Sequence, residues 1–403
     1  MIESRLLRYR PARVRAVTIL ALFLSIVDVS AQGSRLTGGP QLAAAYDAIV
    51  DARFDDVPAL LTKACSNDST RSSGKSAQPA PREACQLLEG VSIWWRIQLD
   101  PNNTSRDDEF RTRVDAAIAA IDAWTMREPL RAEAWFYLGG AYGARAQWRV
   151  LRGERLSAAR DGKRIKDALE RAVQLDPALQ DAYFGIGLYH YYAAVAPAAV
   201  RFLRFLLLLP GGDREKGLEE MLRAREGGEI LRSEADYQLH LIYLWYEKRT
   251  DRALELLRAL HERHPRNPHF LQSIATIEDV YLHDTAASLR TWQQLLDAAR
   301  AGTVTEPAMS ETSARLGLAR ELDARGDTDD AIAHLREVIE RKPAAPFGAL
   351  ARAQLQLGRV LDHRGQRSEA VTAYRAALDL VPPGDPDRIA PAARAGIRAP
   401  STR

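Results

Sequence analysis

Apolar residues recur along most of this chain at the three- and four-residue spacing of amphipathic helices. Three 34-residue segments share this spacing and end near a proline: 234–267, 312–345 and 351–384. The apolar/polar alternation of β-strands is absent. Paired helices that return with this period predict a solenoid, in which each repeat packs only on its neighbours.

The last of these segments shows what each residue type does. Gly358 and Ala370 are small, which lets the two helices of one repeat cross closely, and Tyr374 fills the space left beside them. Gly365 relaxes the backbone between the helices. Pro382 lacks an N–H group and ends the second helix.

Other stretches carry related patterns. The segment 105–129 predicts a second helix of a pair, and 268–301 has helical periodicity with fewer signature residues. The next first helix contains the spacing W-x2-L-G-x2-Y, formed by Trp135, Leu138, Gly139 and Tyr142.

On these motifs the chain resembles tetratricopeptide-repeat proteins of the exported bacterial type over most of residues 40–384. The resemblance implies an all-α fold, a right-handed superhelical solenoid of antiparallel helix pairs, with about 16 helices. We expect the array to occupy residues 32–384.

The first 31 residues differ from the rest and predict a signal peptide. An apolar run at 17–27 is too short for a comfortable membrane span. Small residues at Val29 and Ala31 predict cleavage after Ala31 and an exported protein, periplasmic or secreted. An uncleaved N-terminal anchor is the alternative. The positive region before the apolar run consists of Arg5, Arg8, Arg10, Arg13 and Arg15.

The export segment also accounts for the net charge. Its five arginines against Glu3 and Asp28 give +3, which equals the +3 of the whole chain and leaves the remainder near zero. Nucleic-acid binding needs a basic face in the folded part. We therefore expect no nucleic-acid partner.

The only two cysteines, Cys65 and Cys85, flank a polar, turn-rich loop at 66–83. In an oxidising compartment a disulfide between them would brace this loop at its base. Two separate thiols are the alternative.

The candidate catalytic and ligand-binding motifs in the sequence are incomplete. Gly74, Lys75 and Ser76 resemble the end of a phosphate-binding loop, but the earlier glycine is missing and no strand precedes them. His261 and His264 lie at a helix end, where histidines usually interact with solvent or with terminal carbonyls. The sequence predicts no catalytic, cofactor or metal site and no enzyme.

An apolar insertion at 193–213 separates the two helices of one repeat. It predicts either a helix buried against the array or an exposed surface for a hydrophobic partner or the membrane interface. Residues 185–218 also resemble eukaryotic tetratricopeptide proteins of inclusion-body and lipid-droplet clearance. That resemblance implies lipid association and peripheral membrane contact through 193–210.

In tetratricopeptide arrays the first helices line the concave face, so the resemblance implies a groove for an extended peptide or an amphipathic helix. Packing of its aromatic residues against the insertion is the alternative. The predicted groove residues are Phe136, Phe184, Tyr191, Tyr192, Gln238, Trp245, Tyr246, Arg320 and Arg359, with Asp323, Asp362 and His363 in the same register.

The end of the chain, 385–403, contains three prolines and predicts a flexible tail. Taken together, the sequence predicts a non-catalytic scaffold that binds a protein or peptide partner in the cell envelope. A lipid-associated helper that acts through 193–210, or an accessory subunit of an envelope enzyme or secretion complex, are the alternatives.

Overall fold

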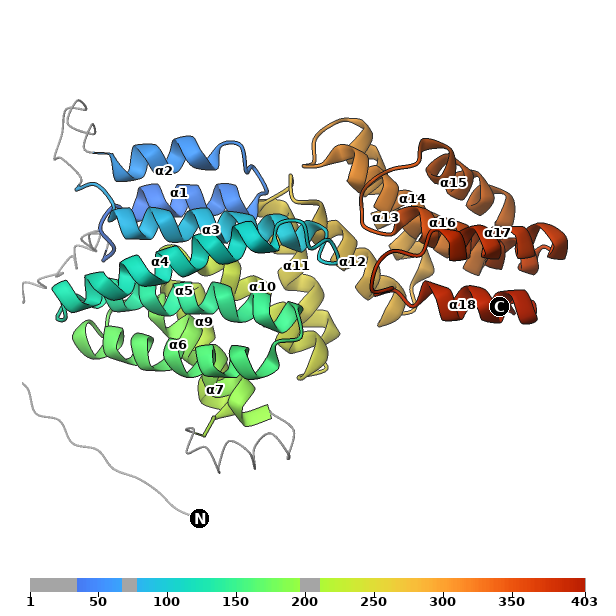
Figure 1. Ribbon diagram of the computed structural model, residues 1–403. Coiled ribbons are helices and arrows are strands. Elements are labelled where there is room, and N and C mark those ends of the chain that lie inside the picture. The colour runs from blue at the N-terminus through green and yellow to red at the C-terminus, as the bar shows by residue number, and fades with distance from the viewer. Residues whose placement is uncertain (1–34, 67–77, 196–210, 403) are drawn as a thin grey trace, which may run out of the picture. The chain divides into compact units, whose positions relative to one another are not determined.

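The computed structural model describes residues 35–66, 78–195 and 211–402. These ranges contain 17 helices and no strand, which confirms the all-α fold (Figure 1). The described residues all belong to one compact unit, Ser34–Arg403. The predicted signal peptide at 1–31 and residues 196–210 of the predicted insertion lie outside the described residues.

The first half of the unit consists of seven helices. They are α1 (Gly39–Val50), α2 (Val57–Cys65), α3 (Arg82–Leu99), α4 (Asp107–Arg127), α5 (Ala132–Leu151), α6 (Arg155–Leu175) and α7 (Ala182–Val195).

The second half contains the remaining ten. They are α9 (Arg214–Gly227), α10 (Arg232–Trp245), α11 (Thr250–Arg263), α12 (Pro268–Val280), α13 (Thr285–Arg300), α14 (Pro307–Arg325), α15 (Thr328–Arg341), α16 (Ala349–His363), α17 (Arg367–Asp379) and α18 (Ile389–Arg398).

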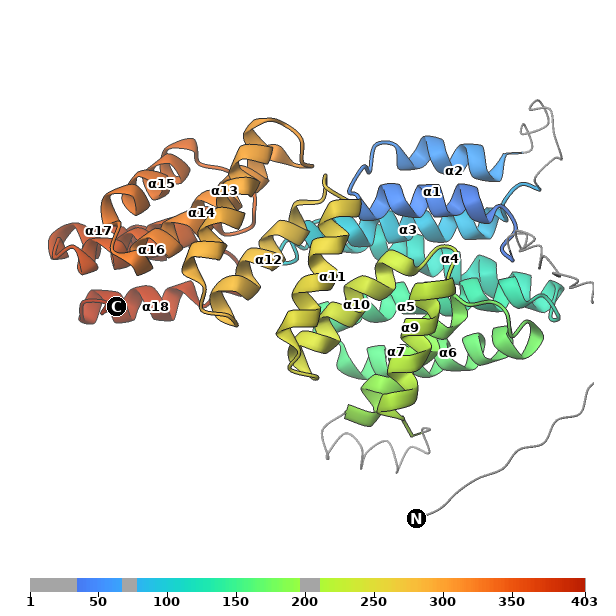
Figure 2. The ribbon, with the colours of Figure 1, turned by 180° about the vertical axis from the view of Figure 1, so that it is seen from behind.

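Each helix packs against the next, so the described chain runs as a succession of helix hairpins (Figures 1 and 2). The predicted repeats 312–345 and 351–384 contain the pairs α14–α15 and α16–α17. Gly326 and Gly365 make the turns between these helices with φ of 92° and 78°, a region that favours glycine. The carboxylate of Asp213 accepts a hydrogen bond from the N–H of Lys216 and caps α9.

The glycines of the repeats allow the two helices of a repeat to cross closely, as the sequence predicts. A Cβ atom on Gly358 would lie 2.5 Å from the ring of Tyr374 in α17, and one on Gly139 would lie 2.5 Å from Leu169 in α6. Such distances are shorter than real carbon contacts, so only glycine lets these helices approach so closely.

The N-terminal helices also contact repeats far along the chain, which nearest-neighbour packing does not predict. Trp95 of α3 packs its ring against Tyr237 of α10 and Phe270 of α12 at centroid distances of 5.2 and 6.2 Å. Turns that precede α12, α14 and α16 bond to the ends of α1 and α3. These hydrogen bonds run from Arg266 N to Asp51, from Asn267 to Val50 O, from Thr305 to Ala52 O and from Phe347 N to Asp100.

The structure differs from the predicted flexible tail. Residues 389–398 form α18, which packs against α16 and α17 with Ile389 and Ala393 buried. Arg367 donates to the carbonyl of Ile397, and the N–H of Ser401 donates to Asp362. The last repeat therefore ends in a packed helix that covers its apolar side.

Cys65 and Cys85 form a disulfide, which confirms the predicted pair. It joins the end of α2 to the first turn of α3. The helix α3 begins at Arg82, slightly before the predicted end of the polar loop, and residues 67–77 of that loop lie outside the described residues.

Candidate peptide-binding face

Four of the predicted groove residues lie in the interior and line no open surface. Phe136, Phe184 and Tyr191 have buried side chains that belong to the core between helices, and Gln238 is buried as well. This corrects the prediction for these four residues. The register identified the correct helices, but other parts of the chain cover this face.

Gln238 shows how the face of α10 is covered. Its side-chain amide donates to Gln147 of α5 at 3.2 Å and to Glu234 at 3.4 Å. Tyr46 of α1 donates to the same Glu234 at 2.9 Å. Burial raises the pKa of the Glu234 carboxyl, and these donors partly oppose that shift. The network fastens α1 and α5 onto α10.

An aromatic cluster remains near the end of α10. Tyr192 and Tyr246 stand edge-to-face at 5.6 Å, and both meet Tyr191 in the same way. Trp245 is 49% exposed and Tyr246 is 45% exposed, so these two predicted residues do reach solvent. The hydroxyl of Tyr191 donates to Glu247, which also pairs with Arg214 at the start of α9.

In the C-terminal half, the first helices of successive repeats are joined by contacts between polar side chains. Arg320 of α14 lies 3.1 Å from Asp279 of α12, and His363 of α16 lies 2.9 Å from Asp323 of α14. Arg320 also pairs with Glu321 at 2.8 Å. These pairs hold α12, α14 and α16 in a fixed relation along their polar faces.

The polar face of α16 has groups without partners. Arg352, Gln356, Arg359 and His363 follow one another at helical spacing and share one side of the helix. Three covered atoms on this side, Arg352 Nε, Gln356 Oε1 and His363 Nε2, have no hydrogen-bond partner in the described part of the chain. Arg359 is exposed and makes no ion pair with any described residue. We call these four residues the α16 polar face.

The chemistry of the α16 polar face suits a peptide main chain. Nδ1 of His363 lies 2.9 Å from Asp323, and in the tautomer with the proton on Nδ1 the ring presents Nε2 as an acceptor. Gln356 presents a second acceptor and Arg359 presents donors. Arg352 pairs with Asp387 at 3.2 Å, so only its Nε–H remains as a donor. The four residues cover a length of about 16 Å along the helix, close to five residues of extended peptide.

Arg359 and His363 were predicted for this surface, but Arg352 and Gln356 were not. Both follow from the same register, since Arg352 lies seven and Gln356 three residues before Arg359. What the sequence does not reveal is that their polar atoms lack partners, because that depends on the helices packed beside α16.

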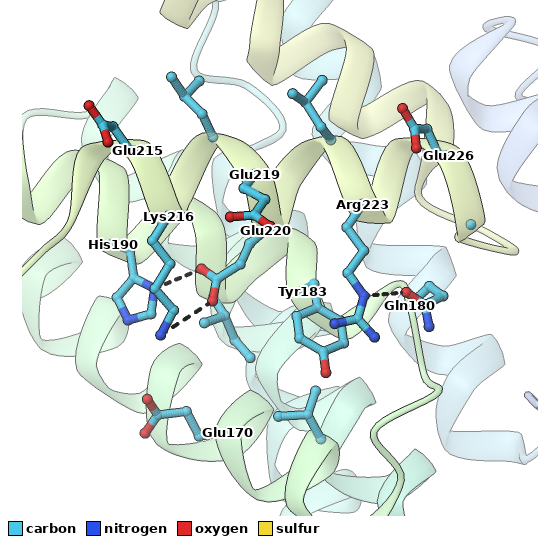
Figure 3. Close-up of a pocket in the computed structure, with 15 residues that line it drawn as sticks. Glu170, Gln180, Tyr183, His190, Glu215, Lys216, Glu219, Glu220, Arg223 and Glu226 are labelled. Carbon is cyan, nitrogen blue, oxygen red and sulfur yellow. Dashed lines mark hydrogen bonds and ion pairs between the residues drawn. The ribbon is translucent and has the colours of Figure 1, made fainter.

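A hollow of about 1150 Å³ lies where α6, α7 and α9 meet (Figure 3). Glu220 lies 2.7 Å from His190 Nδ1 and 3.8 Å from Lys216. The guanidinium of Arg223 stacks 3.6 Å above the Tyr183 ring. Its central charges bond to one another, so the hollow is a weaker candidate than the α16 polar face.

The histidines considered for metal binding have separate partners. His264 bonds to Ser233 at 2.8 Å, and His269 bonds to Tyr237 at 3.0 Å. Burial lowers the pKa of both rings to about 4. Among the described residues, no three His, Cys, Asp or Glu side chains are grouped to hold a metal ion.

No described helix combines the length and the apolar character that a membrane span requires. The predicted peripheral contact through 193–210 falls mainly on residues 196–210, outside the described part.

Residues 351–382, which form α16 and α17, match the family model of the tetratricopeptide repeat. The chain carries a tetratricopeptide repeat. The predicted resemblance to tetratricopeptide-repeat proteins is confirmed, with the family model matching this one repeat, whereas the exported bacterial type stays a prediction. The α16 polar face belongs to the first helix of the matched repeat. No curated protein matches the chain.

Several solved tetratricopeptide structures are similar to this chain. The Cut9–Hcn1 hetero-tetramer of the APC/C matches with a TM-score of 0.46 and 13% identity, over 87% of this chain and 53% of the other. This chain thus spans about half of that one. YrrB, a TPR protein with an unusual peptide-binding site, matches with a TM-score of 0.30 and 15% identity, over 70% of this chain and 98% of the other. IFIT1 bound to Gppp-AAAA matches with a TM-score of 0.40 and 13% identity, over 81% of this chain and 65% of the other. No function is carried over from them.

Proposed function

We propose that this protein is a non-catalytic scaffold of the cell envelope that binds an extended segment of a protein partner along the first helices of its C-terminal repeats. The α16 polar face carries this proposal, because three covered polar atoms without partners lie beside the exposed Arg359. A buried polar atom without a partner costs about 1–3 kcal/mol. A bound peptide main chain would offset that cost with its own N–H and C=O groups.

The expected ligand has an acidic residue opposite Arg359. Arginine binds carboxylates through two parallel N–H donors. The exposed Trp245 and Tyr246 offer a second, aromatic contact for a partner that is larger than a peptide.

A peptide library displayed on phage tests the proposal, with residues 32–403 as the immobilised protein. We expect selected peptides to bind the wild type and to lose roughly tenfold or more in affinity on Arg359→Ala. Arg375→Ala removes an exposed arginine from α17 and is the matched control. Equal binding by both variants would refute the α16 polar face as the site.

A second variant separates binding from stability. Gln356→Leu removes an unpartnered acceptor, so we expect the free energy of unfolding to rise by about 1 kcal/mol while peptide affinity falls. If Gln356 only supported the fold, its substitution would lower the free energy of unfolding and the peptide affinity together.

The envelope location is part of the proposal and rests on residues 1–31. Expression of the full chain in a Gram-negative bacterium, followed by fractionation and mass measurement, tests it. We expect a periplasmic product that begins at Gln32. A cytoplasmic product of full mass contradicts export, and a full-mass product in the membrane fraction indicates the uncleaved anchor.

A further inference from the structure

The turn between α5 and α6 exposes apolar side chains. Val150, Leu151 and Leu156 are 64%, 36% and 67% exposed. They are three of the eleven large apolar side chains that are exposed in the described residues, and they fall within seven consecutive positions. We call residues 149–160 the hairpin tip.

The hairpin tip is held in place from behind. Arg152 pairs with Asp107 of α4 at 2.7 Å and donates to the carbonyl of Pro101 at 2.6 Å. The indole of the buried Trp148 donates to the same Asp107 at 3.1 Å. Gly153 turns the chain with φ of 78°. The exposed apolar groups therefore sit on a preformed turn.

The charge of the hairpin tip is positive. Four arginines, at 149, 152, 155 and 160, oppose Glu154 and the adjoining Asp161, which pairs with Arg149, so the formal charge is 4 − 2 = +2. The adjacent first turn of α4 contributes Arg106 and Arg111 against three acids at 107–109, a charge of −1 that leaves +1. Arg155 and Arg160 make no ion pair with the described residues. Their charges are therefore available to a partner.

Apolar and basic groups share one side of the hairpin tip. Leu156 and Arg160 lie four residues apart on α6 and therefore on one face. Exposed aliphatic side chains among unpaired arginines are typical of segments that lie in the headgroup region of a membrane. Nucleic acid would use the arginines but would leave the three aliphatic side chains in water.

We propose that the hairpin tip docks on an anionic phospholipid surface, with Val150, Leu151 and Leu156 entering the interface and Arg155 and Arg160 meeting lipid phosphates. The surface is independent of the α16 polar face. Another exposed apolar run, Val280–Leu282, has a different setting, since Asp279 and Asp284 flank it in the sequence and the nearby Arg320 is paired with Asp279. It is the natural control surface.

Vesicle sedimentation tests the proposal, with the protein from Gln32 onward and vesicles of phosphatidylcholine with or without phosphatidylglycerol. We expect binding only with phosphatidylglycerol, weakened by salt. Arg155→Gln with Arg160→Gln should weaken it roughly 30-fold. Val150→Ser with Leu156→Ser should weaken it roughly tenfold or more.

Two matched pairs serve as controls. Arg375→Gln with Arg394→Gln changes the net charge equally at exposed sites far along the chain, and Val280→Ser with Leu282→Ser removes apolar groups from the other turn. Both should sediment like the wild type. Circular dichroism verifies that all variants are folded.

Three outcomes would overturn the proposal. One is equal binding to both kinds of vesicle, and another is unchanged binding of the hairpin-tip variants. In the third, no protein sediments with vesicles, while the wild type binds a fluorescent oligonucleotide and the hairpin-tip variants do not. That result would assign the arginines to nucleic acid.

Discussion

The carboxylate of Asp100, at the end of α3, accepts hydrogen bonds of 2.9 and 3.1 Å from the backbone N–H of Phe347, 247 residues later. In a one-dimensional solenoid each repeat contacts only its neighbours. Here the N-terminal helices also bond to turns before α12, α14 and α16. The described unit should therefore unfold more cooperatively than a simple array.

Loss of this contact should weaken the whole unit. We expect Asp100→Ala to lower the free energy of unfolding by about 1–3 kcal/mol, because a covered N–H loses a charged acceptor. Hydrogen exchange should accelerate in the turn at 344–348 as well as around residue 100. Asp55→Ala, which removes an exposed carboxylate paired with Arg96 at 3.4 Å, should change stability by less than about 1 kcal/mol. An effect confined to residues near 100 would contradict the coupling.

Two glycines in first helices should respond in opposite directions to alanine. Gly358→Ala places a Cβ atom 2.5 Å from the Tyr374 ring and should destabilise the protein by about 1–3 kcal/mol. Gly143→Ala meets no atom within 4 Å and should stabilise it by about 0.5–1 kcal/mol, because alanine has the higher helix propensity. Chemical denaturation measures both, and the same sign for both would contradict the packing argument.

The disulfide should stabilise the N-terminal helices. Replacement of Cys65 and Cys85 by alanine opens a loop with a sequence separation of 20 and should lower the free energy of unfolding by roughly 3 kcal/mol. A reducing agent should lower the melting temperature of the wild type to that of the double variant, whose own melting temperature should not change. If the reducing agent lowers the melting temperature of both proteins equally, its effect does not come from this disulfide.

Acid should destabilise the fold through its buried histidines. Burial lowers the pKa of His240 to about 3 and of His269 to about 4, below the unfolded value of about 6.5. Between the folded and unfolded pKa values, the unfolded chain binds more protons than the folded protein. The contribution of these histidines to stability is therefore fully present above pH 6.5 and is lost as the pH falls toward 4. His269 alone accounts for a loss on the order of 3 kcal/mol.

Denaturation of the wild type and of His269→Phe across this pH range measures that loss. The difference between the two proteins should shrink or change sign as the pH falls, because the variant lacks the titrating ring. The comparison also removes the effect of carboxyls such as Glu234, whose pKa burial raises. A difference that is independent of pH would contradict the assignment.

Much of the fold follows from local pattern. The spacing of Gly358, Gly365 and Tyr374 predicted a close helix crossing and a turn, and both occur. The prediction of a flexible tail was wrong, because three prolines had suggested that the end of the chain frays. Pro391 lies in the first turn of α18, where a missing N–H breaks no helical hydrogen bond.

The candidate site was only half accessible to sequence reasoning. Arg359 was correctly placed on the exposed face of a first helix, whereas Phe136 and Gln238 were assigned to an open groove and are buried. Helical register tells which side of a helix a residue occupies. It does not tell which other segment lies over that side.

By itself, the sequence determined that the chain is helical and that helices of one repeat pair, and it favoured the disulfide, since these depend on residues close along the chain. It missed the final helix, α18. Only the tertiary structure decided that α1 and α3 bond to turns up to 253 positions away, and that three polar atoms on α16 lack partners. Contacts of that kind depend on the small angles between successive helices, which accumulate along the chain. No local sequence pattern specifies the accumulated angle.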